Sequence, residues 1–253
     1  RCLEKSGSDL TVITQDGAIS LSTFLPIDQV AGSAQAISTN IQNEFLASTR
    51  AYSTVFGWQS ILYPQGSYSL FNIPRTSLLA DQYVINSQTG AWCKFTGQNA
   101  ACWSLFNGDL YFGAQDGGVI YKADTGTSDN SADIDWKIRP AFSYFGSRGN
   151  QKIFSLCRPH FTTNGAPAFA IDLNLNFSNI NPTNVPTTPT LSAAIWDTSK
   201  WDESNWADEV TSQAWTTVFG IGECASPTIR GNTNSITLSF TAYDMIWQTG
   251  SSI

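Results

Sequence analysis

A series of short apolar segments separated by glycine turns, within residues 82–124, constrains the fold more than any other feature of the chain. The breaks include Asn107 with Gly108 and Asp116 with Gly117. Asn-Gly and Asp-Gly pairs accept the positive φ angles that tight hairpin turns require. Residues 110–112 and 119–121 are mostly β-branched or aromatic, which favours strand over helix. The pattern predicts a meander of about four strands, the size of one β-propeller blade.

The segment before this meander carries a hairpin signal and a helix signal. Asp16 and Gly17 separate residues 9–14 from residues 18–21, and both segments have strand character. Residues 34–48 are the helix candidate, because Ile37, Ile41 and Phe45 would form one apolar stripe on a helix. We therefore expect residues 1–126 to form a propeller-like β-meander with one helical insertion.

The second half of the chain has longer strands. Residues 125–132 are small and polar, which is typical of a linker, and we place the domain boundary there. Residues 168–177 alternate, with Ile171, Leu173, Leu175 and Phe177 on one side, as in an antiparallel strand with one buried face. Residues 127–253 are thus expected to form a β-sandwich-like domain with a Trp-rich loop. The fold class predicted for the whole chain is all-β, with partial β-propeller blades followed by an antiparallel β-sandwich-like domain.

Composition favours a protein that is partly covered by neighbours. Of 253 residues only 13% are charged, yet the chain has nine Trp, eight Tyr and fifteen Phe. This much aromatic surface must be buried inside the chain or against other subunits, which favours an assembly subunit. A single secreted β-domain would have a similar composition. The net charge of −7 argues against a nucleic-acid binder.

The charges are unevenly distributed along the sequence. One stretch without acids contains Lys137, Arg139, Arg148, Lys152 and Arg158, and a later acidic stretch includes Asp197 and Asp202. The two stretches are candidates for complementary patches at a subunit interface or along a channel. Two solvated faces would give the same pattern, and the sequence leaves both interpretations open.

The acidic stretch also contains three regularly spaced tryptophans. Trp196, Trp201 and Trp206 lie five residues apart, a spacing that fits neither helix nor strand. It favours successive turns, in which Asp197 and Asp202 bond to backbone amides beside the tryptophans. The tryptophans are candidates for a platform on which sugars stack. We favour the other interpretation, that they pack a long loop against a sheet or a neighbouring subunit.

Signals for catalysis and for cofactors are lacking. His160 is the only histidine, and the chain contains no GxSxG elbow, Walker loop or GxGxxG motif. Asp109, Asp116 and Asp124 are predicted in turns, where aspartate mostly bonds to the backbone. The five cysteines match no zinc or CxxC spacing and are expected to be buried thiols in a protein assembled in a reducing cytoplasm. The sequence therefore predicts no enzyme, no metal, no cofactor and no membrane insertion.

Several segments, taken in order, resemble one family. They are residues 9–21, 82–97, 106–126, 141–161 and 220–229. Together they are similar to the tail-nozzle proteins of short-tailed bacteriophages, including the tail tubular protein B type and the packaged-DNA stabilisation proteins. Such proteins are normally much longer, so we expect this chain to be the C-terminal portion of one.

The resemblance implies a structural role in the virion. Nozzle subunits form a hexameric ring that encloses the DNA exit channel, retains the packaged genome and passes it at ejection. The implied partners are other copies of the chain, the tail adaptor, tail fibre or needle proteins, and double-stranded DNA in passage. The implied location is the virion tail, assembled in the host bacterial cytoplasm. A carbohydrate-binding β-protein, such as a receptor-binding tail component, is the alternative function.

Overall fold

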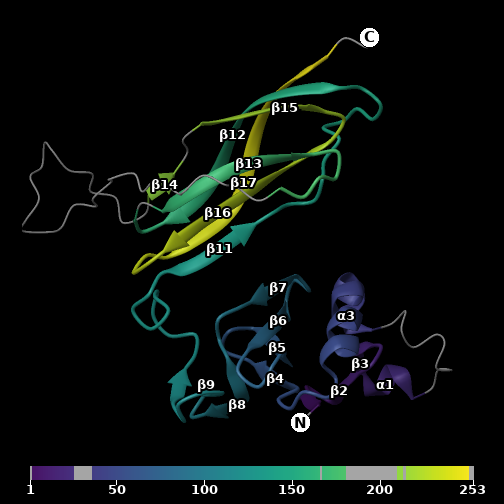
Figure 1. Cartoon of the computed structure of the whole chain (residues 1–253), viewed down its shortest axis with the longest axis vertical. Coiled ribbons are helices and arrows are strands. Elements are labelled where there is room, and N and C mark those ends of the chain that lie inside the picture. Colours follow the sequence, from purple (N-terminus) through teal and green to yellow (C-terminus); the bar gives the residue numbers. More distant parts are fainter. Residues whose placement is uncertain (1, 26–35, 166, 181–209, 213–214, 251–253) are drawn as a thin grey trace, which may run out of the picture. The chain divides into compact units, whose positions relative to one another are not determined.

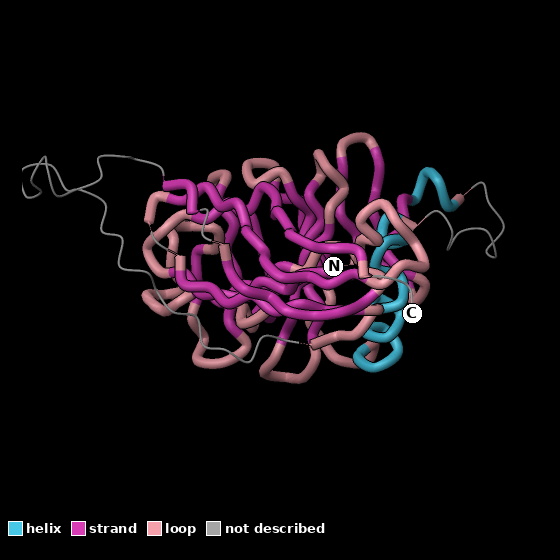
Figure 2. Tube along the Cα trace, turned by 90° about the horizontal axis from the view of Figure 1, so that it is seen from above, coloured by secondary structure: helices cyan, strands magenta, loops and turns pink. Residues whose placement is uncertain are grey.

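Strands far outnumber helices in the computed structural model of the chain, which confirms the predicted all-β fold (Figures 1 and 2). The structure describes residues 2–25, 36–165, 167–180, 210–212 and 215–250. The chain divides into two compact units, Arg1–Thr125 (unit 1) and Gly126–Ile253 (unit 2). Within the described residues the strands form five separate sheets, and none of them closes on itself.

Unit 1 contains three antiparallel sheets in chain order. Sheet A comprises β1 (Leu3–Ser6), β2 (Asp9–Thr14) and β3 (Gly17–Ser20), and the short helix α1 (Leu21–Phe24) follows it. Sheet B comprises β4 (Gln59–Tyr63), β5 (Tyr68–Pro74), β6 (Ala80–Asn86) and β7 (Trp92–Phe95). Sheet C comprises β8 (Ala100–Phe106), β9 (Asp109–Ala114) and β10 (Ile120–Lys122). The expected hairpin turn at Asn107 and Gly108 is present, with φ angles of 52° and 87°.

The meander expected over residues 82–124 is divided between two sheets, which corrects the prediction of a single blade. β6 and β7 complete sheet B, whereas β8, β9 and β10 form sheet C. The chain changes sheet at Gly97, where φ is 92°, a value that L side chains rarely adopt. Sheet B is a four-stranded meander of blade size. β1 contacts β4 and β4 contacts β8, so the first strands of the three sheets are neighbours, as the inner strands of propeller blades are.

Buried side-chain amides join sheet B to sheet C. Gln59 lies beside the free edge of β8, where its amide donates to Trp103 O at 2.8 Å and its oxygen accepts from Trp103 N at 2.9 Å. Asn72 Nδ2 donates to Ala100 O at 3.1 Å, and Asn72 Oδ1 accepts from Gln82 Nε2 at 2.9 Å and from Trp103 Nε1 at 3.1 Å. These side chains are all buried. They supply the hydrogen bonds that a neighbouring strand would otherwise give to the edge of β8.

The predicted helix lies slightly further along the chain. A 3₁₀ turn, η2 (Ile37–Ile41), leads into α3 (Gln42–Tyr52). Phe45 of the expected stripe is fully buried, and its ring meets those of Trp58, Phe71 and Tyr83 at centroid distances of 6.0–6.5 Å. The helix therefore packs on sheet B, as its apolar stripe predicts.

Unit 2 consists of two sheets that share one apolar core. Its strands are β11 (Ile134–Ile138), β12 (Lys152–Thr163), β13 (Ala168–Leu175), β14 (Val210–Ser212), β15 (Thr216–Gly222), β16 (Ala225–Thr233) and β17 (Leu238–Thr249). Sheet D has the order β11-β16-β13. In sheet E, β12 pairs with β17 along one edge and with β14 and β15 along the other. Phe154 and Phe161 of sheet E pack with Ile171 and Ile229 of sheet D, as in a β-sandwich.

The alternating strand over residues 168–177 is confirmed except at its end. Ile171 and Leu173 are buried in the core, but β13 ends at Leu175. Phe177 has a φ of 62° and is 65% exposed, so it does not continue the buried row. Asn174, which the alternation places on the side away from the core, is also fully buried, and Thr228 and the Ile180 backbone supply its hydrogen bonds.

Candidate interaction surfaces

Large apolar side chains cover the outer side of sheet E. Along β15, Val218 is buried while Phe219 and Ile221 are 74% and 51% exposed. The strand register places Ile153 of β12 opposite Ile221, and Leu156 of β12 opposite Ile246 of β17. We call these five residues, Ile153, Leu156, Phe219, Ile221 and Ile246, the outer face of sheet E. A contiguous exposed apolar face of this kind marks an interaction site in soluble proteins.

A charged cluster continues the same side of sheet E. Arg158 of β12 lies opposite Asp244 of β17, and Arg158 Nε donates to Asp244 Oδ2 at 3.1 Å. His160 Nε2 lies 2.9 Å from the same oxygen, and Arg158 Cζ lies 4.6 Å from the centre of the Trp215 ring. The hydrogen bond from Arg158, and then that from His160, lower the pKa of Asp244. The predicted candidate Arg158 thus has a carboxylate and an indole as partners beside the apolar face.

The other predicted arginines lie at different places in unit 2. Arg148 stacks on Tyr144, with Cζ 4.8 Å from the ring centre. Tyr144 in turn meets the exposed Phe177 at a centroid distance of 6.4 Å. Arg139 follows the last residue of β11, and Lys137 lies within that strand. Arg139 and Arg148 are both exposed, whereas Arg158 is partly buried.

Lys152 does not lie on the surface, which corrects its selection as an interface or channel residue. It is fully buried, and its ammonium donates to Ser147 O at 2.5 Å, Asn150 O at 3.0 Å and Glu223 O at 2.9 Å. These carbonyls come from the loop before β12 and from the turn between β15 and β16. Lys152 therefore holds two loops together inside unit 2. The predicted aromatic and acidic candidates all lie outside the described residues. They are Trp196, Trp201, Trp206, Asp197 and Asp202.

Unit 1 has an apolar groove that the sequence did not indicate. Its volume is about 960 Å³, and Ile13, Val55, Phe56, Trp58 and Cys102 contribute to its lining. Phe56 is 90% exposed. The groove lies where the starts of the neighbouring strands β4 and β8 meet the turn after α3. Only the sequence signal of consecutive apolar residues before Gly57 could have pointed to it.

A second apolar hollow lies on sheet C. It has a volume of about 330 Å³, and Phe106, Tyr111, Phe112 and Ile120 line it. Phe106 and Ile120 are 72% and 74% exposed. Cys102 lines both hollows, so the apolar surface of unit 1 continues from the groove onto sheet C.

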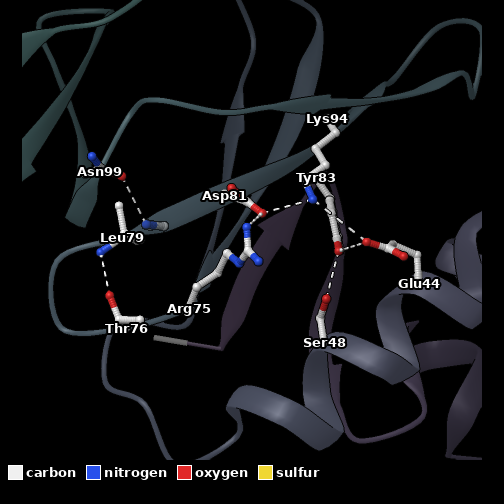
Figure 3. Close-up of polar contacts among 10 residues, drawn as sticks. Glu44, Ser48, Arg75, Thr76, Leu79, Asp81, Tyr83, Lys94 and Asn99 are labelled. Carbon is white, nitrogen blue, oxygen red and sulfur yellow. Dashed lines mark hydrogen bonds and ion pairs between the residues drawn. The ribbon is translucent and has the colours of Figure 1, made fainter. Parts of the chain in front are cut away.

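A polar cluster joins α3 to sheet B (Figure 3). Asp81 accepts from Lys94 Nζ at 2.9 Å and pairs with Arg75 at 3.4 Å. The Tyr83 hydroxyl lies 2.8 Å from Ser48 Oγ and donates to Glu44 at 3.2 Å. Burial raises the pKa of Tyr83 to about 12, so this phenol is not a base at neutral pH. Its role in this arrangement is to hold the helix on the sheet.

The described residues contain no group of three His, Cys, Asp or Glu side chains placed to hold a metal ion. In the same part of the chain, no helix has the length and apolar character needed to cross a membrane. All five cysteines are thiols, as expected, but only Cys157 and Cys224 are buried, and Cys93 is exposed. Burial raises the pKa of Cys157 to about 12. A thiol with so high a pKa is a poor nucleophile.

No protein-family model matches the sequence, and a comparison with curated proteins finds no match.

Proposed function

We propose that this chain is a structural subunit of the tail nozzle of a short-tailed bacteriophage. In this role copies of the chain form a ring, hexameric in the family it resembles, around the DNA exit channel. The ring retains the packaged genome and passes it at ejection. Its neighbours would be the tail adaptor and the tail fibre or needle proteins, and the chain would act without catalysis, cofactor or membrane insertion.

The observation that carries this proposal is the presence of separate apolar surfaces on the two units. Unit 1 exposes Phe56, Phe106 and Ile120, and unit 2 exposes Phe219 and Ile221. A ring is built from head-to-tail contacts, in which each copy uses two different surfaces, one for each neighbour. If the chain acted as a monomer, these large apolar side chains would stay in contact with water, which is unfavourable.

The charge of the chain is compatible with DNA in passage. With a net charge of −7, the subunit repels phosphates on average and does not hold DNA tightly. A strongly basic lining would instead slow DNA transit by binding its backbone. Electrostatics thus support a conduit more than a DNA-binding protein.

Substitution on the outer face of sheet E tests the proposal. Phe219→Ser should weaken self-association tenfold or more, because exposed aromatic anchors carry much of the energy of an interface. Phe177→Ser is the matched control, since Phe177 is 65% exposed but lies outside that face. Light scattering across a concentration series measures the association, and circular dichroism checks the fold. Equal association of both variants and the unmodified chain would count against this surface.

A carbohydrate-binding role is the second candidate, and Trp215 is the observation that favours it. Its indole is 42% exposed and lies beside Arg158, which is bonded to Asp244. An aromatic face next to fixed polar groups is a common composition of small-molecule sites. Specific binding to a glycan array that Trp215→Ala abolishes would support this role, and the absence of any binding would reject it.

A further inference from the structure

One edge strand of unit 2 carries charges of both signs in an ordered row. β11 is one of the two edge strands of sheet D, and among the described residues its only partner strand is β16. Asp133, Asp135, Lys137 and Arg139 alternate with the other residues of this segment and are all exposed. Trp136 and Ile138 point the other way and pack against the core. The outward row therefore runs from two acids to two bases along this strand. Figure 1 shows β11 beside β16, its partner strand.

The segment from Asp133 to Arg139 is complementary to itself when it is reversed. Its sequence is DIDWKIR. In an antiparallel pair centred on Trp136, Asp133 lies opposite Arg139, and Asp135 lies opposite Lys137. Ile134 lies opposite Ile138, and Trp136 lies opposite its own copy. Residues that are directly opposite in an antiparallel pair lie on the same side of the sheet, so every charged pair unites opposite signs.

We propose that β11 pairs antiparallel with β11 of a second copy of this chain, across a twofold axis at Trp136. The contact would join two copies of sheet D into one continuous sheet. It repeats each of the two opposite-charge pairs twice, and it brings Ile134, which is 40% exposed, against Ile138 of the second copy. A twofold contact uses the same edge on both copies and closes on itself, so it produces a dimer and no open chain.

Charge selects this occupant over other strands. Unpaired edges attract any extended segment, and charged side chains normally discourage that. Here a parallel copy of β11 would place like charges side by side, whereas an antiparallel copy places opposite charges side by side. Asp133 already accepts from Asn234 Nδ2 at 3.0 Å, and Arg139 donates to Asn179. Each of these groups has further hydrogen-bonding capacity, because a carboxylate has two oxygens and a guanidinium has five N–H donors.

The β11 contact does not depend on the proposed ring, because a twofold contact differs from the head-to-tail contacts from which a ring is built. Failure of the dimer would leave the ring test unaffected. To separate the two, the experiment uses the full chain carrying Phe219→Ser, so that the outer face of sheet E does not contribute to self-association.

Charge reversal provides the test. Asp135→Lys places lysine opposite Lys137, and Lys137→Asp places aspartate opposite Asp135, so each variant alone should dimerise roughly tenfold or more weakly. When the two variants are mixed, both opposite-charge pairs are restored and a mixed dimer should form. Sedimentation equilibrium measures all three samples, with Asp116→Lys, in an exposed turn of unit 1, as the charge control. Hydrogen exchange of residues 134–138 should slow as concentration rises.

Three results would overturn the proposal. The first is a chain that stays monomeric at every concentration while the β11 amides exchange at a constant rate. The second is dimerisation of the single variants as strong as that of the unreversed chain. The third is a mixture of folded variants, checked by circular dichroism, that fails to form the mixed dimer.

Discussion

Unit 1 and unit 2 both consist mainly of antiparallel strands, but different groups hold their sheets together. In unit 1 the buried amides of Gln59 and Asn72 bond to the free edge of β8. In unit 2 the sheets lie face to face, and side chains such as Phe154 and Phe161 fill the space between them. Sheets that meet near their edges need polar groups to satisfy the backbone, whereas sheets that stack need apolar volume.

The difference extends to the surfaces that each unit offers. Unit 1 presents its apolar groove near the region where its sheets meet, lined in part by Val55, Phe56 and Trp58. Unit 2 presents an apolar outer face on a sheet whose inner face is already the core. Unit 1 therefore offers a hollow and unit 2 offers a flat sheet, which suits contacts with different surfaces of a neighbour.

A cavity in the apolar core of unit 2 should reduce the stability of the chain more than any other change considered. Phe161→Ala should lower the free energy of unfolding of unit 2 by about 4 kcal/mol, because it leaves a cavity among Trp136, Phe169 and Phe240. Hydrogen exchange followed by mass spectrometry resolves the two units, and amides of unit 1 should exchange unchanged. Phe177→Ala, on the surface of the same unit, is the control and should have little effect. Equal destabilisation of both units would show that the chain unfolds as one body.

The buried side-chain amides that join sheet B to sheet C of unit 1 should contribute somewhat less to stability. Asn72→Ala removes hydrogen bonds to Ala100, Gln82 and Trp103 and should destabilise unit 1 by about 3 kcal/mol. The same substitution at Asn174 of unit 2 removes two bonds of a buried amide on sheet D, on the side away from the apolar core, and should cost about 2 kcal/mol. Urea unfolding monitored by exchange of each unit compares the two. A larger loss for Asn174→Ala would mean that side-chain amides matter no more in unit 1 than in unit 2.

Sequence patterns predicted those parts of the fold that depend on local chemistry. The turn at Asn107 and Gly108 and the helix around Phe45 were both predictable, because dihedral preference and apolar periodicity depend only on residues that are close in sequence. The division of residues 82–124 between two sheets was not predictable, since strand spacing does not say which edge a strand joins. That choice depends on Gln59 and Asn72, which are distant in sequence from β8.

The candidate surface was predicted less well than the fold. Lys152 belongs to a basic run that looks solvated in sequence, yet three carbonyls from two loops enclose its ammonium. Phe219 and Ile221 alternate with small residues, and nothing local tells which side of the strand faces the core. Only the pairing of β15 with β12 places them on the outside.

A buried acid in unit 1 should make a small, pH-dependent contribution to the stability of that unit. Glu4 of β1 is 6% exposed, and its Oε1 accepts from Ser69 Oγ at 2.8 Å. Burial raises the pKa of Glu4 above its ordinary value, more than the hydroxyls of Ser69 and Ser60 lower it. The folded state then keeps this proton to a higher pH than the unfolded chain. The stability of unit 1 should therefore fall as pH rises through the raised pKa.

Glu4→Gln removes this charge while keeping the shape of the side chain. We expect a gain of roughly 1 kcal/mol at pH 8 and little change at about pH 3, where the carboxyl is protonated in both states. Thermal unfolding at the two pH values measures the difference. Asp116→Asn, at an exposed turn, is the control and should show no such pH dependence. A gain that is equal at both pH values would contradict the role of burial.

We propose that the apolar surfaces of the two units join copies of this chain into a ring. Electron microscopy of the purified full chain, imaged at high concentration, tests it most directly. We expect closed rings with a central pore in the unmodified chain and no rings in the Phe219→Ser variant. Particles no larger than a twofold dimer under every condition would contradict it.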